Sequence, residues 1–225
     1  MLTVCWSPKG GSGTSVVAAA LALQTAARGR DCLLVDLDGD QPALLGQAAP
    51  GEGLTDWLAA SAEVPVDALL ALEIAVVERL RLLPCGTRRP VELSMDRLAL
   101  AAALFESSGR QVIVDAGSTW SRGRWWSSSC GAVMVLRPCY MAALRARQAP
   151  DGLTGFDLVV IEEPGRVLSA SDIAAAVGAT LQVRLPWDPA VARAVDAGLL
   201  ASRLPRSLRP LRAVGPTSDP VGARP

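Results

Sequence analysis

Short runs of apolar residues recur along the chain and alternate with longer stretches that mix alanine, leucine and polar residues. Continuous apolar runs of this kind are typical of parallel strands that helices cover on both faces. The pattern therefore predicts an α/β fold with three layers, in which a mostly parallel twisted sheet carries helices on both faces. The expected strands are residues 2–6, 32–35, 80–84, 112–115, 132–136, 156–161 and 181–185.

The stretches between these runs supply the expected helices. The first, residues 16–28, is rich in small residues and ends at Gly29, as a helix packed closely on a sheet would. Residues 51–78 form a variable region in which we expect two short helices and no chemistry. The other expected helices are residues 90–106, 172–177 and 190–198.

Prolines at positions 205, 210, 216, 220 and 225 interrupt the end of the chain. Because proline breaks helices and this segment is polar, we expect one domain over residues 1–204 and a disordered tail over residues 205–225. Arginines at 203, 206, 209 and 212 recur every third residue in this region. They fit either a solvated basic tail, which we favour, or a contact with a phosphate-rich surface.

Composition narrows the classes of function. The 225 residues suit one sizeable domain, and a net charge of zero gives no general argument for a nucleic acid or a membrane as partner. There is no histidine, which excludes histidine-based catalysis and leaves oxygen ligands for any metal. The five cysteines show no C-x-x-C spacing, and no apolar run is long enough to span a bilayer. A cytoplasmic protein is expected.

The glycine-rich stretch over residues 7–15 lies between the first expected strand and the first expected helix. Glycines there let the backbone approach a ligand, and the N–H groups that open a helix attract phosphate. Lys9 is the only lysine among 22 basic residues, which indicates a chemical requirement for lysine at this position. The alternative is a tight turn without a ligand.

The loop Lys9-Gly10-Gly11-Ser12-Gly13-Thr14-Ser15 resembles the deviant Walker A loop of the ParA/MinD family of P-loop ATPases. That family places one lysine at the start of the loop and a second near its end, where this chain has Thr14. The resemblance implies the P-loop NTPase fold, with ATP and Mg²⁺ as cofactors. It implies phosphate contacts from residues 9–15, a catalytic role for Lys9 reaching into a partner subunit, and Mg²⁺ on Ser15.

Two acidic segments add to the resemblance. Asp36 and Asp38 follow the second expected strand, and they match the second acidic motif of the family, in which Asp38 orients the attacking water and Asp36 lies near Mg²⁺. A turn-forming acidic cluster is the alternative for this segment. Asp115 ends the strand 112–115 in the Walker B form, which implies a contact with Mg²⁺ through water.

Later segments also follow the family's order. Residues 82–86 and 137–145 resemble its middle motifs, and Pro186 with Asp188 resembles the closing segment that lies beside the base. Where relatives commonly have an asparagine that binds adenine, this chain has Glu162. Within the family, the motifs of the strands and of the C-terminal segment are most similar to those of the pilus-positioning (TadZ/CpaE-like) and septum-site branches.

Two functions remain open. The first is a nucleotide-dependent homodimeric switch that positions a cellular assembly (pilus or secretion, septum, or chromosome), with slow or absent hydrolysis because Thr14 replaces a lysine. The second is a non-catalytic scaffold that dimerises and binds an unidentified protein partner. A metabolic relative that uses the same loop is a third, less favoured reading. Trp120, Trp125 and Trp126 fit an interface or, as we favour, the packing of a helix against the sheet.

Overall fold

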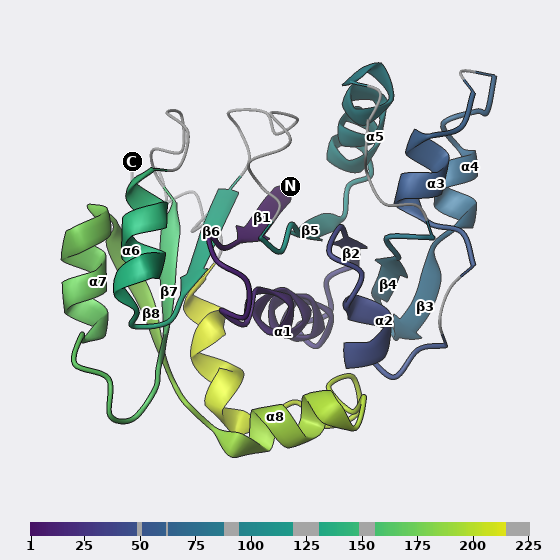
Figure 1. Ribbon diagram of the computed structural model, residues 1–225. Coiled ribbons are helices and arrows are strands. Elements are labelled where there is room, and N and C mark those ends of the chain that lie inside the picture. The colour runs from purple at the N-terminus through teal and green to yellow at the C-terminus, as the bar shows by residue number, and fades with distance from the viewer. Residues whose placement is uncertain (49–50, 62, 88–94, 119–130, 149–155, 215–225) are drawn as a thin grey trace, which may run out of the picture.

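A computed structural model describes residues 1–48, 51–61, 63–87, 95–118, 131–148 and 156–214. Its centre is an eight-stranded sheet in the order β3-β4-β2-β5-β1-β6-β7-β8, parallel except for β3 (Figure 1). The expected mostly parallel α/β sheet is thereby confirmed. The strands are β1 (Leu2–Trp6), β2 (Cys32–Asp36), β3 (Ile74–Val77), β4 (Leu80–Leu83), β5 (Gln111–Asp115), β6 (Gly131–Leu136), β7 (Asp157–Glu162) and β8 (Thr180–Pro186).

Helices cover both faces of the sheet and separate two apolar cores. One core lies under α1, α2, α8 and the 3-10 helix η2, and the other lies under α3, α4, α5, α6 and α7. The strands alternate between the two cores, so that β1 sends Val4 into one and Cys5 into the other. The helices are α1 (Thr14–Ala26), α2 (Gln41–Leu44), α3 (Leu54–Leu58), α4 (Ala68–Ala71), α5 (Met95–Ser107), α6 (Tyr140–Arg147), α7 (Ala170–Val177), α8 (Pro189–Asp196) and η2 (Arg206–Ala213).

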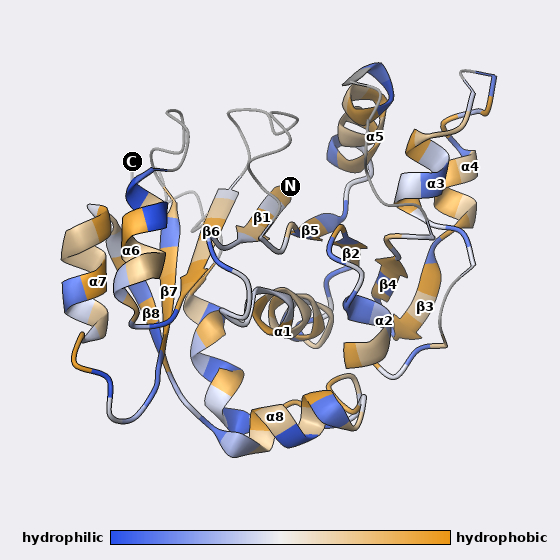
Figure 2. Ribbon diagram, in the orientation of Figure 1, coloured by the Kyte–Doolittle hydropathy of each residue, from blue (hydrophilic) through white to orange (hydrophobic). Residues whose placement is uncertain are grey.

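The central strands are apolar on both faces, and this explains why the sequence predicts them well. All residues of β1, β2 and β5 are buried. Figure 2 shows the same contrast between apolar strands and helices whose outer surfaces carry polar residues. Helix α1, which passes beneath the middle of the sheet, is apolar almost all round, and its alanines allow it to pack closely.

Strand β3 is absent from the sequence-based prediction. It forms an antiparallel hairpin with β4 at the edge of the sheet, and its residues alternate between half-buried and exposed. The turn of this hairpin places Arg79 at φ 65°, a conformation that usually calls for glycine. Without a glycine at the turn, the sequence carries no hairpin signal.

The expected disordered tail is wrong for its first part. Residues 206–213 form η2, and Leu208, Leu211 and Val214 are buried against α1 and β8. A 3-10 helix repeats every three residues, so leucines at this spacing share one face while Arg206, Arg209 and Arg212 share another. Pro210 excludes an α-helix but is accommodated in η2. Residues 215–225 lie outside the described residues.

Two further expectations concern residues that the structure does not describe. The tryptophan-rich segment 120–126 and the start of the expected helix 90–106 lie outside the described residues. In the described ranges, no helix combines the length and the apolar character needed to cross a membrane.

Candidate functional site

The loop between β1 and α1 adopts a conformation that favours glycine at two positions. Gly11 has φ 74° and Gly13 has φ 89°, both in the left-handed region. A Cβ atom on Gly13 would lie 2.7 Å from the Cδ1 atom of Ile161 on β7. Gly13 also caps α1 without a side-chain hydrogen bond, so the first N–H groups of the helix have no side-chain acceptor there.

Serine side chains hold the loop from inside. The hydroxyl of Ser12 donates to the carbonyl oxygen of Lys9 at 2.7 Å, and the hydroxyl of Ser7 lies 2.9 Å from both the Lys9 carbonyl and the Ser12 hydroxyl. Ser12 is buried, so its side chain serves the loop and its backbone N–H is the group left for a ligand. Thr14, the first residue of α1, is buried as well.

Asp115 and Asp36 lie on neighbouring strands at the same level of the sheet, where their backbones are in register. Both are fully buried. Burial raises the pKa of Asp36 to about 7 and that of Asp115 to about 6, and the proximity of the two carboxylates adds to the rise for Asp36.

Asp36 uses its carboxylate to shape the following turn. Its Oδ1 accepts the backbone N–H groups of Asp38 and Gly39, at 3.0 and 2.7 Å, and its Oδ2 accepts the N–H of Gln41 at 3.1 Å. Both oxygens are therefore engaged by the chain itself. The geometry makes Asp36 a positioning residue for the acidic segment, which is the turn-forming alternative that the sequence left open.

Asp38 and Gly117 lie against each other at the carboxyl end of the sheet. A Cβ atom on Gly117, whose φ is 52°, would lie within 2.5 Å of three atoms of the Asp38 carboxyl group. The carbonyl oxygen of Gly117 accepts the N–H of Ser7 at 2.9 Å. Gly117 thus connects the end of β5 both to Asp38 and to the phosphate loop. Partial burial, with Asp40 nearby, raises the pKa of Asp38.

Gln41, at the start of α2, links α1 to the end of β5. Its Nε2 donates to the Asp115 carboxylate at 2.8 Å and to the carbonyl oxygen of Ser15 at 2.9 Å. Gln41 and the nearby Ser15 side chain partly offset the rise that burial causes in the pKa of Asp115. Gln41 is fully buried, and its Oε1 has no hydrogen-bond partner within the described residues.

These donors fit a magnesium ion held together with a nucleotide. Ser15, Asp115 and Gln41 offer hydroxyl, carboxylate and amide oxygens, which are the ligands that Mg²⁺ prefers, directly or through water. Among the described residues no group of three or more histidine, cysteine, aspartate or glutamate side chains is arranged to hold a metal. An ion would therefore depend on phosphate oxygens and water as well as on these residues.

An apolar hollow of about 220 Å³ opens beside the phosphate loop. It is lined by Gly13, Pro186, Trp187 and Asp188, with Arg137 on its wall. Pockets that enclose whole small molecules measure about 300–1,000 Å³, so this hollow suits one part of a ligand, such as a base. Phosphates attached to that part would extend toward Gly13.

Arg137 and Trp187 form the polar wall of this hollow. The guanidinium carbon of Arg137 lies 4.7 Å from the centre of the Trp187 ring, and its Nη1 pairs with Glu163 at 2.8 Å. The backbone N–H of Trp187 donates to the carbonyl oxygen of Glu162 at 2.9 Å. An arginine stacked on an aromatic ring offers a flat surface for a planar ligand.

The structure brings most of the predicted site residues to one edge of the sheet. The phosphate loop, Asp36, Asp38 and Asp115 lie at the carboxyl ends of β1, β2 and β5, while Pro186 and Asp188 share a hollow with Gly13. Sequence reasoning missed Gln41, Gly117, Arg137 and Trp187. Gln41 had a usable signal, because it stands three residues after Asp38 in the acidic segment.

A mostly parallel sheet with a glycine-rich loop after β1, and acids at the carboxyl ends of β2 and β5, is typical of the P-loop NTPase fold. Comparison with solved structures places the chain more closely. A ParA family ATPase from Chlorobium tepidum matches with a TM-score of 0.77 at 19% identity, over 93% of this chain and 95% of that one. The MinD cell division protein of Aquifex aeolicus matches with a TM-score of 0.76 at 18% identity, over 95% and 94%.

A third match is the septum site-determining protein MinD of Pyrococcus horikoshii, solved in complex with Mg-ADP. It has a TM-score of 0.73 at 17% identity, over 94% of this chain and 93% of that one. No family model matches the sequence, and no curated protein matches it. The chain therefore has the fold of the ParA and MinD ATPases, and this likeness is one of structure.

Proposed function

We propose that this protein is a nucleotide-dependent switch of the ParA/MinD type, which binds ATP with Mg²⁺ and positions another cellular assembly. The observation that carries the proposal is the joining of the phosphate loop to the acidic residues, with Gly13 at φ 89° on one side and Asp115 bonded through Gln41 to Ser15 on the other. A tight turn without a ligand needs no such arrangement of buried oxygens, whose desolvation is costly.

In this proposal, N–H groups of residues 10–15 bind the phosphates, Ser15 contacts Mg²⁺, and Asp115 acts through water. Asp38 is the residue that orients the attacking water, since it is only partly buried, while the Asp36 carboxylate is fully buried and engaged in the turn. The base lies between Pro186, Asp188 and the stacked pair of Arg137 and Trp187.

Dimerisation would use the edge of the sheet that carries the site. Large apolar side chains are exposed after the carboxyl ends of three strands there: Tyr140 after β6, Val167 after β7 and Trp187 after β8. Exposed apolar groups gathered on one edge suit a protein interface. Lys9, in the loop at the same edge, would then reach phosphates held by the partner subunit.

The second candidate is a scaffold that dimerises and binds partner proteins without turnover. The presence of Thr14 favours it, because a buried neutral hydroxyl cannot supply the charge that stabilises a departing phosphoryl group. Glu162 at the end of β7 favours it as well, since the asparagine that binds adenine in relatives is missing.

Titration calorimetry with ATP tests the proposal, with and without Mg²⁺. The switch requires binding that strengthens with Mg²⁺ and is weakened in Ser15→Ala. Thr25→Ala is the matched control, because Thr25 is a hydroxyl on the same helix that bonds only to the Leu21 carbonyl, away from the loop. Absence of heat and of any melting shift at millimolar ATP would leave the scaffold as the better account. Phosphate release measured alongside separates binding from turnover.

A further inference from the structure

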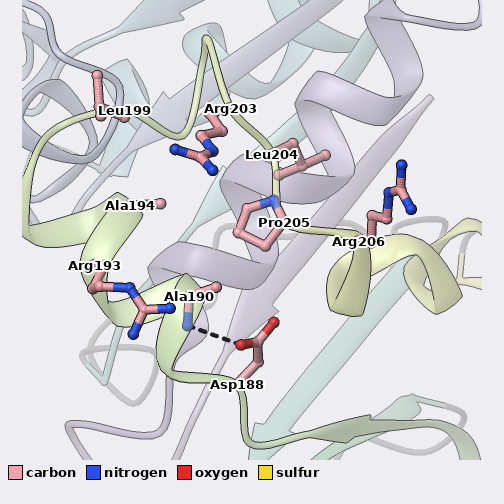
Figure 3. Close-up of a pocket in the computed structure, with 9 residues that line it drawn as sticks. All are labelled: Asp188, Ala190, Arg193, Ala194, Leu199, Arg203, Leu204, Pro205 and Arg206. Carbon is pink, nitrogen blue, oxygen red and sulfur yellow. Dashed lines mark hydrogen bonds between the residues drawn. The ribbon is translucent and has the colours of Figure 1, made fainter.

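A second hollow, of about 470 Å³, lies on the other side of the start of α8 (Figure 3). It is formed by α8 and by the chain that leads from α8 into η2. Asp188 lines both this hollow and the candidate base pocket, so the two spaces are neighbours. The lining residues are Asp188, Ala190, Arg193, Ala194, Leu199, Arg203, Leu204, Pro205 and Arg206.

Three arginines line the hollow, and none of their side chains has a hydrogen bond or close ion pair within the described residues. The one acid of the lining, Asp188, has both oxygens engaged. Its Oδ1 accepts the N–H of Ala190 at 2.8 Å, and its Oδ2 accepts the hydroxyl of Ser207 at 2.7 Å. Asp188 attracts Arg193 only at longer range. The hollow therefore carries an excess of positive charge.

Some arginines elsewhere in the described residues are paired with an acid. Arg110 and Arg137 are each held by a glutamate at 2.8 Å, and Arg166 also pairs with Glu163. Unpaired guanidinium groups gathered around one concave space differ from these, because like charges repel and an anion between them relieves the repulsion.

The directions of the side chains single out two of the three arginines. Figure 3 shows the Arg193 side chain, from α8, extending beside Ala190 toward Asp188, and the Arg203 side chain, from the following segment, at the other end of the same hollow. Arg206 points away, along the exposed face of η2. Between the first two lie the small apolar side chains of Ala190, Ala194 and Pro205.

We propose that this hollow binds a compact anion with an apolar body, that is, a small phosphorylated or carboxylated molecule. Guanidinium groups match the geometry of phosphate and carboxylate oxygens, and the apolar floor suits the rest of such a ligand. The volume lies within the range of small-molecule sites, about 300–1,000 Å³. The site does not depend on the proposed nucleotide function.

A polyanion is the competing ligand, and the structure disfavours it at this place. A nucleic-acid backbone presents phosphates in series and needs cations spread along a surface, whereas Arg193 and Arg203 line one hollow. The series of arginines lies instead along η2, where Arg206, Arg209 and Arg212 share the exposed face. Arg209 thus provides a matched control, since it belongs to that series and does not line the hollow.

Phenyl phosphate is a suitable probe, because it joins a dianion to a small apolar ring. We expect millimolar binding by calorimetry, weaker binding of phenol and of inorganic phosphate, and a loss of about tenfold or more in Arg193→Gln and in Arg203→Gln. Arg209→Gln should leave the affinity unchanged. Circular dichroism would verify that each variant is folded, and the shifts of the Ala190 and Ala194 amide resonances would place the probe.

Three results would overturn the proposal. The first is no binding of phenyl phosphate at tens of millimolar. The second is a loss that appears in Lys9→Ala and not in Arg203→Gln, which would place the probe on the phosphate loop. The third is an equal loss in Arg203→Gln and Arg209→Gln, accompanied by tighter binding of duplex DNA, which would assign these arginines to a polyanion surface.

Discussion

The side-chain amide of Gln41 donates a hydrogen bond to the carboxylate of Asp115 at 2.8 Å, and this bond connects the acidic segment after β2 to the end of β5. The same amide reaches the Ser15 carbonyl at 2.9 Å. A residue that lies outside the predicted set thereby holds two of the predicted metal-site residues in place. Because Gln41 is fully buried, its loss cannot be replaced by bulk water.

Gln41→Leu should weaken the binding of Mg-ATP and lower stability by about 1–3 kcal/mol, because the substitution leaves the buried Asp115 carboxylate without one of its donors. Gln47→Leu is the control, since Gln47 bonds only to the Leu45 carbonyl at the end of the same short helix. Calorimetry and thermal melting measure the two effects. If the two variants bind Mg-ATP with equal affinity, the positioning role of Gln41 is lost.

Stability should depend on pH through Asp36 and Asp115, whose folded pKa values are raised to about 7 and about 6. A carboxyl group whose pKa is higher in the folded protein favours folding when protonated. Without Mg²⁺, the free energy of unfolding should therefore fall as pH rises from about 4 to about 7. Asp115→Asn should flatten this slope, as melting in the presence of a chelator would show.

Added Mg²⁺ with nucleotide should oppose that loss, because a bound cation stabilises the ionised carboxylates. A melting temperature that rises between pH 5 and pH 7 in the metal-free protein would contradict the assignment of raised pKa values. The control is Asp172→Asn, which should leave the fall in stability between pH 4 and pH 7 in place. Asp172 is an exposed capping residue, and its bonds to Ser169 lower its pKa.

The sequence predicted the parts of the fold that local chemistry determines. Buried strands such as β2 and β5 are apolar on both faces, and the phosphate loop needs glycine at positions 11 and 13 whatever surrounds it. Strand β3 escaped prediction because it is half exposed and its turn contains Arg79 in place of glycine. Helix η2 was not predicted because its burial depends on α1, which lies far away in the sequence.

The candidate site divides in the same way. Ser15, Asp38 and Asp115 stand in recognisable local patterns at the ends of strands. Arg137 and Trp187 become neighbours only when β6 and β8 are placed in one sheet. No local sequence pattern therefore predicts their contact. The engagement of Asp36 in its own turn is likewise visible only in three dimensions, because a carboxylate after a strand looks the same in sequence whether it binds metal or backbone.

Gly13→Ala should abolish nucleotide binding and lower stability by more than the roughly 1–2 kcal/mol that a left-handed conformation costs an alanine, because the new Cβ would lie 2.7 Å from Ile161. Gly165→Ala carries a comparable conformational cost, at φ 78°, with no atom in the way. Melting of both variants isolates the steric part. Equal stability of the two would mean that the Ile161 side chain turns away at little cost.

Leu211→Ala should lower stability by about 2–5 kcal/mol, because this side chain of η2 is fully buried against the rest of the domain. Arg209→Ala, on the exposed face of the same helix, should change it by less than about 0.5 kcal/mol. Denaturant unfolding measures both. A negligible effect of Leu211→Ala would support the predicted domain boundary at residue 204 and would mean that η2 contributes little to the stability of the domain.

Thr14→Lys should tighten the binding of ATP, because a charge-assisted hydrogen bond to phosphate contributes about 1.5–3 kcal/mol, or roughly 10- to 150-fold in affinity. Ser61→Lys, on the surface far from the loop in sequence, controls for the added charge. Calorimetry in the presence of Mg²⁺ measures the affinity, and salt titration confirms that the gain is electrostatic.

Hydrolysis should respond differently from binding, because phosphoryl transfer also requires an oriented water. Thr14→Lys should raise turnover only while Asp38 is intact, so the double variant Thr14→Lys/Asp38→Asn should bind ATP tightly and release little phosphate. This pair of variants separates the missing charge from the residue that orients water. If the wild-type protein already hydrolyses ATP at a rate of about 1 s⁻¹ or more, within the ordinary range for enzymes, and Thr14→Lys adds nothing, then a hydroxyl suffices at position 14 and the slow-turnover argument fails.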